Sequence, residues 1–129
     1  MLKKVLPIVG VIVLVVLIIM LSGLLGDKPE PNDPGNDPDY VEYTFRNERL
    51  LEEHFEKHGI EMGFDSAEEY QKAASDAAND PNALHKLEKE DGDDVYYKEE
   101  TNEFVVISAD GFIRTYFCPD SGKKYFDKQ

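Results

Sequence analysis

The apolar and polar positions of this chain divide it into three stretches of different character. Residues 5–26 are an unbroken uncharged run, mostly of Val, Ile and Leu. Residues 27–39 contain no apolar residue other than proline. From residue 40 onward, apolar residues recur first with helical and then with strand spacing, which is typical of a folded domain. We therefore predict an N-terminal anchor (1–26), an extended linker (27–39) and one domain (40–129).

The run at residues 5–26 is long enough to cross a lipid bilayer as a helix. Its 22 residues would span about 33 Å at about 1.5 Å per residue, and the hydrocarbon core is about 30 Å thick. A cleaved signal peptide is the alternative, although the run is unusually long for one and no A-x-A site follows it. Lys3 and Lys4 precede the run and acidic residues follow it, so the positive-inside rule places the N-terminus in the cytoplasm. We expect a single-pass membrane protein with residues 40–129 extracytoplasmic.

The linker at residues 27–39 reads DKPEPNDPGNDPD, and it holds four of the chain's 7 prolines. It has nothing to bury in a core, so we expect an extended and semi-rigid spacer. Such a spacer would hold the following domain away from the membrane surface.

The first part of the domain is predicted to be helical. Thr44 is expected to cap a helix that runs from about Phe45 to His58, and Gly59 to end it in the left-handed conformation. Within this helix, apolar residues four apart are expected to face the core.

A second helix is predicted from its capping box. Ser66 is the N-cap and Glu69 lies three residues later, the spacing at which the two side chains satisfy the first free amides of a helix. Asp80-Pro81 is expected to end the helix, because the residue before a proline avoids the helical conformation. Residues 81–94 are predicted to be a polar connection with one helical turn at Ala83–Leu87.

The rest of the domain is predicted to be an antiparallel sheet. Aromatic and β-branched runs indicate strands at Val95–Lys98, Glu103–Ser108 and Phe112–Cys118, with a short fourth strand at Lys124–Phe126. Asp110-Gly111 is typical of a two-residue type I′ hairpin turn. The predicted class is α+β, with two N-terminal helices packed on a small antiparallel sheet.

The predicted hairpin register assigns residues to the two faces of the sheet. One face lacks charge and is expected to pack on the helices; it holds Phe104, Val106, Ser108, Ile113, Thr115 and Phe117. The other is expected to be open or half-covered; it holds Val105, Ile107, Phe112, Arg114 and Tyr116. In this register Arg114 pairs with Ile107 and lies on the same open face as Tyr116.

Charge and cysteine content narrow the possible functions. The chain has 14 Lys+Arg and 27 Asp+Glu, a net charge of −13, and residues 40–129 carry −11 of it. This argues against broad electrostatic binding of nucleic acid, which normally needs a basic surface. A single Cys excludes an internal disulfide framework and a cysteine-based zinc cluster.

Two histidines on the first predicted helix are the first candidates for chemistry. His54 and His58 are four residues apart and could share a metal ion, but no third ligand is evident, so no metal is expected. Either histidine could instead work with Arg114, Thr115 and Tyr116 on one strand. A packed helix-face histidine and an ordinary strand are the structural alternatives for these residues.

Four stretches of the domain, taken in order, carry a family resemblance: HFEKHG at 54–59, GFDSAEEY at 63–70, DGFIRTYFCP at 110–119 and GKKYF at 122–126. Together they resemble the C-terminal toxin domains of bacterial polymorphic toxins and prophages, within the barnase–EndoU–colicin E5/D–RelE-like ribonuclease superfamily. The resemblance implies metal-independent cleavage of RNA, without a cofactor. In that reaction the 2′-OH of RNA attacks the neighbouring phosphate, with help from an acid/base group and a cation.

The resemblance also implies roles for individual residues. His54 or His58 would be the acid/base group, and Arg114 would bind the phosphate. Tyr116 would donate a hydrogen bond or stack on a base. Thr115 matches the family motif, although the predicted register turns it inward. The negative charge of the domain departs from the family pattern unless Arg114 and lysines near it form a local basic cleft; these are Lys98, Lys123 and Lys124.

A function of another class fits the same composition. An acidic domain on a stalk could bind a basic protein partner by electrostatic complementarity, as inhibitors of nucleases do. The two hypotheses differ in what they require of the structure. A ribonuclease needs a histidine close to Arg114 and Tyr116, whereas a binding module needs only an acidic surface. The oligomeric state is not indicated by the sequence.

Overall fold

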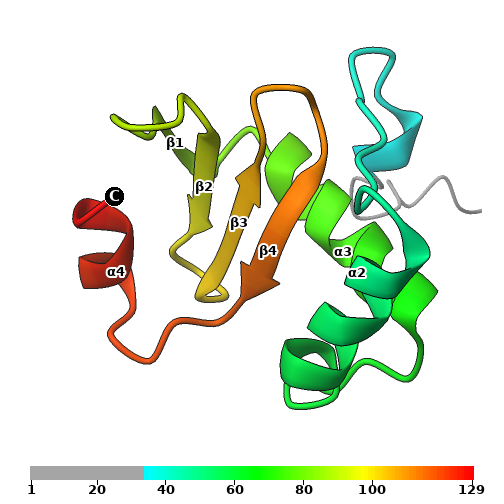
Figure 1. Cartoon of the computed structure of the whole chain (residues 1–129). Helices are drawn as coiled ribbons and strands as arrows, with labels where there is room; N and C mark the ends of the chain where they lie inside the picture. The colour runs from blue at the N-terminus through cyan, green and yellow to red at the C-terminus, as the bar shows by residue number, and fades with distance from the viewer. Residues whose placement is uncertain (1–33) are drawn as a thin grey trace, which may run out of the picture. The chain divides into compact units, whose positions relative to one another are not determined.

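A four-stranded antiparallel sheet in the order β1-β2-β3-β4 organises residues 34–129, the part of the chain that the computed structural model describes (Figure 1). The strands are β1 (Leu84–Leu87), β2 (Asp94–Lys98), β3 (Glu103–Ile107) and β4 (Ile113–Phe117). The helices are the 3-10 turn η2 (Pro34–Asn36), α2 (Glu48–His54), the π-helical turn η3 (Phe55–Gly59), α3 (Ala67–Asn79) and α4 (Lys123–Asp127). The predicted α+β class with an antiparallel sheet is confirmed.

The predicted anchor and the first part of the predicted linker lie outside the described residues. Within residues 34–129, no helix has the length and apolar character needed to span a bilayer. Only the part of the linker from Pro34 onward is described, and it begins with the 3-10 turn η2.

The first helix begins later than predicted and changes its pitch. Its N-cap is Asn47, whose side chain accepts a hydrogen bond from Leu50 N, so the prediction of Thr44 as the cap is wrong. The predicted left-handed conformation at Gly59 is also wrong: the helix continues through this residue as η3, and the positive φ (92°) occurs at Gly63 instead. Gly59 has another role, because a Cβ there would lie 2.5 Å from the ring of Phe55.

The second helix, α3, starts where its capping box predicts. Ser66 is the N-cap, and its side chain accepts a hydrogen bond from Glu69 N at 3.2 Å. The helix ends at Asn79, with Asp80 as the C-cap. Its buried face is rich in alanine, which allows the helix backbone to lie close to the sheet.

Two short elements differ in type from the prediction. Residues 84–87 form strand β1, which pairs with β2, rather than a helical turn. Residues 123–127 form helix α4 rather than a strand, and Phe126 is buried against Val95, Tyr97 and Phe104. Both segments are too short to determine their own conformation, so tertiary contacts decide it.

The β3–β4 hairpin keeps the predicted pairing at its open end but not at its turn. The confirmed pairs are Phe104–Phe117, Val105–Tyr116 and Val106–Thr115. The predicted two-residue turn is wrong: Gly111 N donates to Ser108 O, and Ser108 N donates to Phe112 O, so the loop holds three residues. Ser108 favours this wider turn, because its hydroxyl accepts from Phe112 N at 3.0 Å and donates to Asp110 at 2.5 Å.

A bulge in β4 compensates for the wider turn. The extra loop residue shifts the register by one, and Ile107 pairs with Ile113 instead of with Arg114. Arg114 is the residue left out of the ladder, and pairing resumes at Thr115. Such a bulge re-aims a side chain relative to its strand, and here that side chain is the predicted phosphate ligand.

The two sheet faces are used in the reverse of the predicted way, and both are covered. The face of Val105, Ile107, Ile113 and Tyr116 packs on α2 and α3 in the main core. The face of Phe104, Val106 and Phe117 packs with Phe126 of α4 in a second cluster. Figure 1 shows α3 and α4 on opposite sides of the sheet. Sequence periodicity could not assign the faces, because α4 was not predicted as a helix.

Candidate functional site

A cavity of about 550 Å³ lies where the start of α2 faces the β3–β4 hairpin and the loop before β2. Its walls are formed partly by Phe45, Leu50, Phe112 and Ile113. Its titratable groups are an imidazole, two guanidinium groups and three carboxylates, from His54, Arg46, Arg114, Asp91, Asp93 and Asp110. These residues come from segments that are far apart in the sequence, and the fold brings their polar groups together in one cavity.

His54 reaches this cavity from the last position of α2. Its ring stacks on Phe45, with centroids 5.1 Å apart, and lies 6.2 Å from the ring of His58. Its Nδ1 is buried and has no hydrogen-bond partner among the described residues. Burial lowers the pKa of His54, and the neighbouring His58 and Lys57 lower it further. The imidazole is therefore neutral at pH 7 and able to accept a proton.

Arg114 enters the cavity from the bulge in β4. Its Nη1 lies 2.5 Å from Asp93 Oδ2 and 3.5 Å from Asp91 Oδ2. The Asp93 side chain is only 5% exposed, whereas that of Arg114 is 52% exposed. The hydrogen bond and charge of Asp93 raise the pKa of the Arg114 guanidinium. Arg114 is thus a fixed cation, with one end held by a buried carboxylate.

Arg46 closes another side of the cavity. Its Nη2 lies 2.7 Å from Asp110 Oδ2, and its guanidinium carbon lies 4.4 Å from the centre of the Phe112 ring. A hydrogen bond from Ser108, followed by the contact with Arg46, lowers the pKa of Asp110. With His54 neutral, two arginines and three aspartates give the cavity a net charge of −1.

The other three predicted site residues lie elsewhere. His58 stacks on Phe117, with centroids 5.1 Å apart. Tyr116 is fully buried in the main core, where its hydroxyl donates to Glu103 Oε1 and its carbonyl accepts from the hydroxyl of Tyr70. Burial raises the pKa of Tyr116 far above its ordinary value. Thr115 pairs with Val106 and not with the residues of the cavity.

The lysines predicted to supply a basic cleft do not line the cavity. Lys98 is paired with Asp80 at 3.1 Å and with Glu103 at 3.4 Å. Lys123 is paired with Asp127 at 3.5 Å, within α4. The positive charge at the cavity therefore comes from arginines.

Sequence reasoning missed the acidic residues of this site. The sequence at 91–94, DGDD, has the composition of a solvated turn, yet Asp93 is buried against Arg114. The carboxylates of Glu88, Asp91 and Asp93 lie within 4.8 Å of one another, the spacing of groups that could hold a cation. The guanidinium of Arg114 already provides a positive charge beside two of them. The pairing of Asp93 with Arg114 can be found only in the structure, because the two residues are far apart in the sequence.

The chain was compared with protein families, curated proteins and solved structures. No protein-family model matches the sequence, and a search of curated proteins finds no match. Among solved structures, the chain is similar to one chain of a complex described as a ribonuclease from Escherichia coli with its inhibitor protein. The TM-score is 0.48 at 20% sequence identity, and the match covers 60% of this chain and 95% of that chain.

Proposed function

We propose that residues 40–129 form a ribonuclease-type domain whose site is the cavity between α2 and the β3–β4 hairpin. The observation that carries this proposal is that His54 and Arg114 line the same cavity, although they are far apart in sequence. Tyr116, which the resemblance also implies, lies in the core and takes no part in the proposed site. A neutral imidazole and a fixed guanidinium are the acid/base group and the cation that cleavage of RNA requires.

The reaction follows the chemistry that the family resemblance implies. His54 accepts the proton of the 2′-OH while that oxygen attacks the adjacent phosphorus. The bond from phosphorus to the 5′-oxygen breaks, and the leaving oxygen takes a proton from water. His54 gives its proton to the hydroxide that remains, so the products are a 2′,3′-cyclic phosphate, a 5′-hydroxyl end and a neutral imidazole. Arg114 stabilises the charge that develops on the phosphate.

The pairing of Arg114 with aspartates is compatible with this role. Both contacts are made through Nη1, whereas a guanidinium carries five N–H donors in a planar fork. Asp93 therefore acts as a positioning residue that fixes the direction of the fork. The Arg114 side chain is 52% exposed, which leaves it accessible to a substrate.

A cleavage assay tests the proposal. The purified protein is incubated with end-labelled RNA in EDTA, beside the variants His54→Gln and Arg114→Gln. We expect wild-type cleavage to leave cyclic phosphate ends and each variant to be slower by a factor of about 100 or more. His85→Gln and Arg49→Gln are the matched controls, because neither residue lines the cavity. Cleavage that survives His54→Gln, or no cleavage of any RNA, would contradict the proposal.

A second candidate is an acidic binding module for a basic protein. The observation that favours it is electrostatic: the cavity carries a net charge of −1, and both of its arginines are paired with carboxylates of the same chain. A basic partner that binds wild-type protein, and is released as salt is raised, would support this function when RNA remains uncut.

The proposed location is that of a single-pass membrane protein, with residues 5–26 in the bilayer and residues 40–129 outside the cytoplasm. This rests on the sequence alone. Protease added to intact cells should remove the domain, and full protection of the domain would reverse the orientation.

A further inference from the structure

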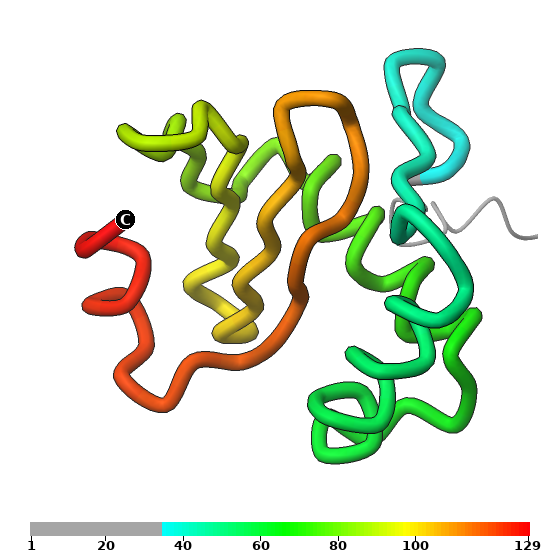
Figure 2. Tube along the Cα trace, in the orientation of Figure 1, coloured from blue at the N-terminus to red at the C-terminus, as the bar shows by residue number. Residues whose placement is uncertain are grey.

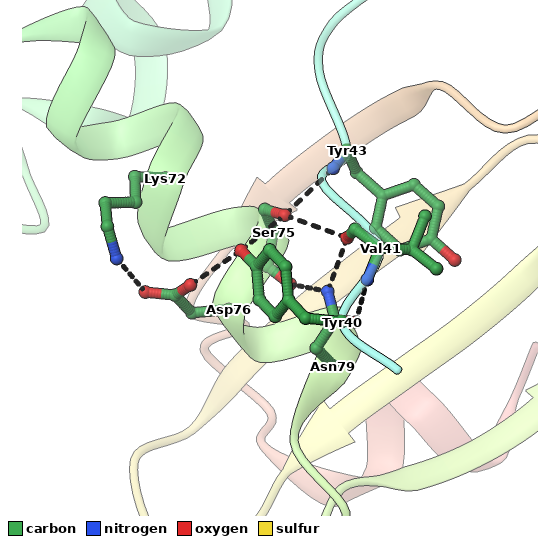
Figure 3. Close-up of polar contacts among 7 residues, drawn as sticks. All are labelled: Tyr40, Val41, Tyr43, Lys72, Ser75, Asp76 and Asn79. Atoms are coloured by element: carbon green, nitrogen blue, oxygen red, sulfur yellow. Dashed lines mark hydrogen bonds and ion pairs between the residues drawn. The ribbon is translucent and has the colours of Figure 1, made fainter. Parts of the chain in front are cut away.

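Residues 40–45, here called the strap, run beside α3, and side chains of that helix bind the main chain of the strap (Figure 3). Val41 N donates to Asn79 Oδ1 at 2.9 Å, and Tyr43 N donates to Ser75 Oγ at 2.9 Å. Phe45 N donates to Gln71 Oε1 at 3.0 Å. The acceptors Gln71, Ser75 and Asn79, here called the polar row, are thus matched to every second residue of the strap.

The spacing of the two elements explains this match. Positions four apart on a helix lie on one face and are separated by about 6.0 Å along the axis. Positions two apart on an extended chain are separated by about 6.6 Å. One helix face can therefore satisfy three alternate amides, with the two chains running in opposite directions. The amides of Tyr43 and Phe45 are partly buried, and leaving them without such acceptors would be costly.

Further contacts hold the strap and the polar row together. Ser75 is 1% exposed, and its hydroxyl accepts from the hydroxyl of Tyr40 at 2.8 Å. The amide of Asn79 also donates to Val41 O at 2.7 Å. On the opposite side, Ile113 N of β4 donates to Thr44 O at 2.9 Å. The strap is bound on one side by α3 and on the other by the edge of the sheet.

The strap leads directly into the wall of the cavity. Its last residue, Phe45, is 4% exposed and stacks on His54 at 5.1 Å. The next residue, Arg46, spans to Asp110 on the hairpin. In Figure 2 the trace continues from the segment before α2 into that helix, which ends at His54. The position of the His54 ring against its neighbours therefore depends on where the strap is held.

We propose that Gln71, Ser75 and Asn79 are positioning residues for the cavity, which act by holding the strap so that Phe45 stays stacked on His54 and Arg46 stays across the cavity. The inference concerns the cavity that the proposed function uses, but neither measurement below involves RNA. A failure of RNA cleavage would leave it standing, and a failure of the measurements below would leave the ribonuclease proposal standing.

The first measurement is amide hydrogen exchange in the full-length protein. The amides of Val41, Tyr43 and Phe45 should exchange more slowly than those of Glu42 and Thr44. Gln71→Met removes the acceptor of Phe45 at nearly constant volume and should speed exchange at that amide at least tenfold. Asn79→Ala should do the same at Val41. Asn82→Ala, an exposed asparagine just after α3, is the matched control and should change neither amide.

The second measurement is an NMR titration of His54. If the polar row only stabilised the fold and did not position Phe45, the pKa of His54 would not change in its variants. Phe45 helps to keep the ring from water, so its release in Gln71→Met should raise the pKa of His54 toward about 6.5, with Asn82→Ala unchanged. The charged groups around the ring are kept in all these variants: Glu53, Lys57, His58, Arg46, Arg114, Asp91, Asp93 and Asp110. Alternate amides that exchange alike in the wild type, or a His54 titration that Gln71→Met leaves unchanged, would overturn the inference.

Discussion

Arg114 Nη1 lies 2.5 Å from Asp93 Oδ2, and it arrives there because the bulge in β4 removes Arg114 from the strand ladder. The wider hairpin turn, the bulge and this ion pair are therefore parts of one arrangement. The Asp93 side chain is only 5% exposed. Burying a charged carboxylate costs free energy, and the ion pair with Arg114 offsets that cost.

Loss of Arg114 should destabilise the domain by leaving that carboxylate without its partner. We expect Arg114→Gln to lower the free energy of unfolding by about 2 kcal/mol, as measured by urea denaturation. Arg49→Gln is the control: its pair with Glu53 is exposed on both sides and should contribute at most about 0.5 kcal/mol. Adding Asp93→Asn to Arg114→Gln should restore part of the loss, and equal effects of the two arginine variants would contradict this account.

The stability of the domain should depend on pH through His54. Because burial lowers the pKa of His54 in the folded state, the unfolded chain binds the proton more readily. The contribution of this group is complete above the unfolded value of about 6.5 and falls as the pH drops below it. His54→Phe keeps a ring on Phe45 without a titrating group. It should reduce the loss of stability between pH 7.5 and pH 5.5, measured by urea denaturation.

Tyr116 should matter for stability and not for the cavity. Tyr116→Phe removes the hydrogen bond to Glu103 and should cost about 1 kcal/mol. Because Tyr116 is fully buried and does not line the cavity, the titration of His54 should stay unchanged. Tyr125→Phe, at a position that is 36% exposed, is the control and should be neutral. A shifted His54 pKa in Tyr116→Phe would show that the phenol communicates with the site.

Gly59 should not tolerate a side chain. A Cβ at this position would lie 2.5 Å from Phe55 Cδ2 and 3.0 Å from Tyr70 Cδ2. Gly59→Ala should therefore destabilise the domain by about 2 kcal/mol through overpacking, as measured by thermal or urea unfolding. Gly63→Ala separates this cause from backbone strain, because Gly63 has a φ of 92° and a Cβ there would meet no atom within 4 Å. That variant should cost about 1 kcal/mol.

The sequence predicts those parts of the fold that local chemistry determines. Ser66 caps α3 because its side chain can bind Glu69 N in any context. The pairs at the open end of the hairpin follow from two apolar strands that must align. The turn itself escaped prediction, because Asp110-Gly111 favours a tight turn locally while Ser108 accepts and donates the hydrogen bonds of a wider one.

The sequence predicts part of the candidate site, because some of its residues can be recognised from their chemistry alone. His54 and Arg114 are chemically distinctive residues, and the structure brings both to one cavity. The pairing of Asp93 with Arg114 could not be seen, because the burial of an acidic turn is decided by the loop before β2 folding back on β4. The predicted site residue Tyr116 lies instead in the core, since periodicity could not tell which sheet face α3 would cover.

Recognition of the strap through its main chain has a consequence for how this domain can diverge. The polar row binds backbone N–H groups and one backbone carbonyl of the strap. Every residue has both groups except proline, which lacks the N–H. Side chains at positions such as Glu42 and Thr44 can therefore drift while the architecture persists. Distant relatives should be recognisable by three polar residues at intervals of four on one helix, by the absence of proline at the three matching positions of the strap, and by an aromatic residue in the place of Phe45, whose ring packs on His54.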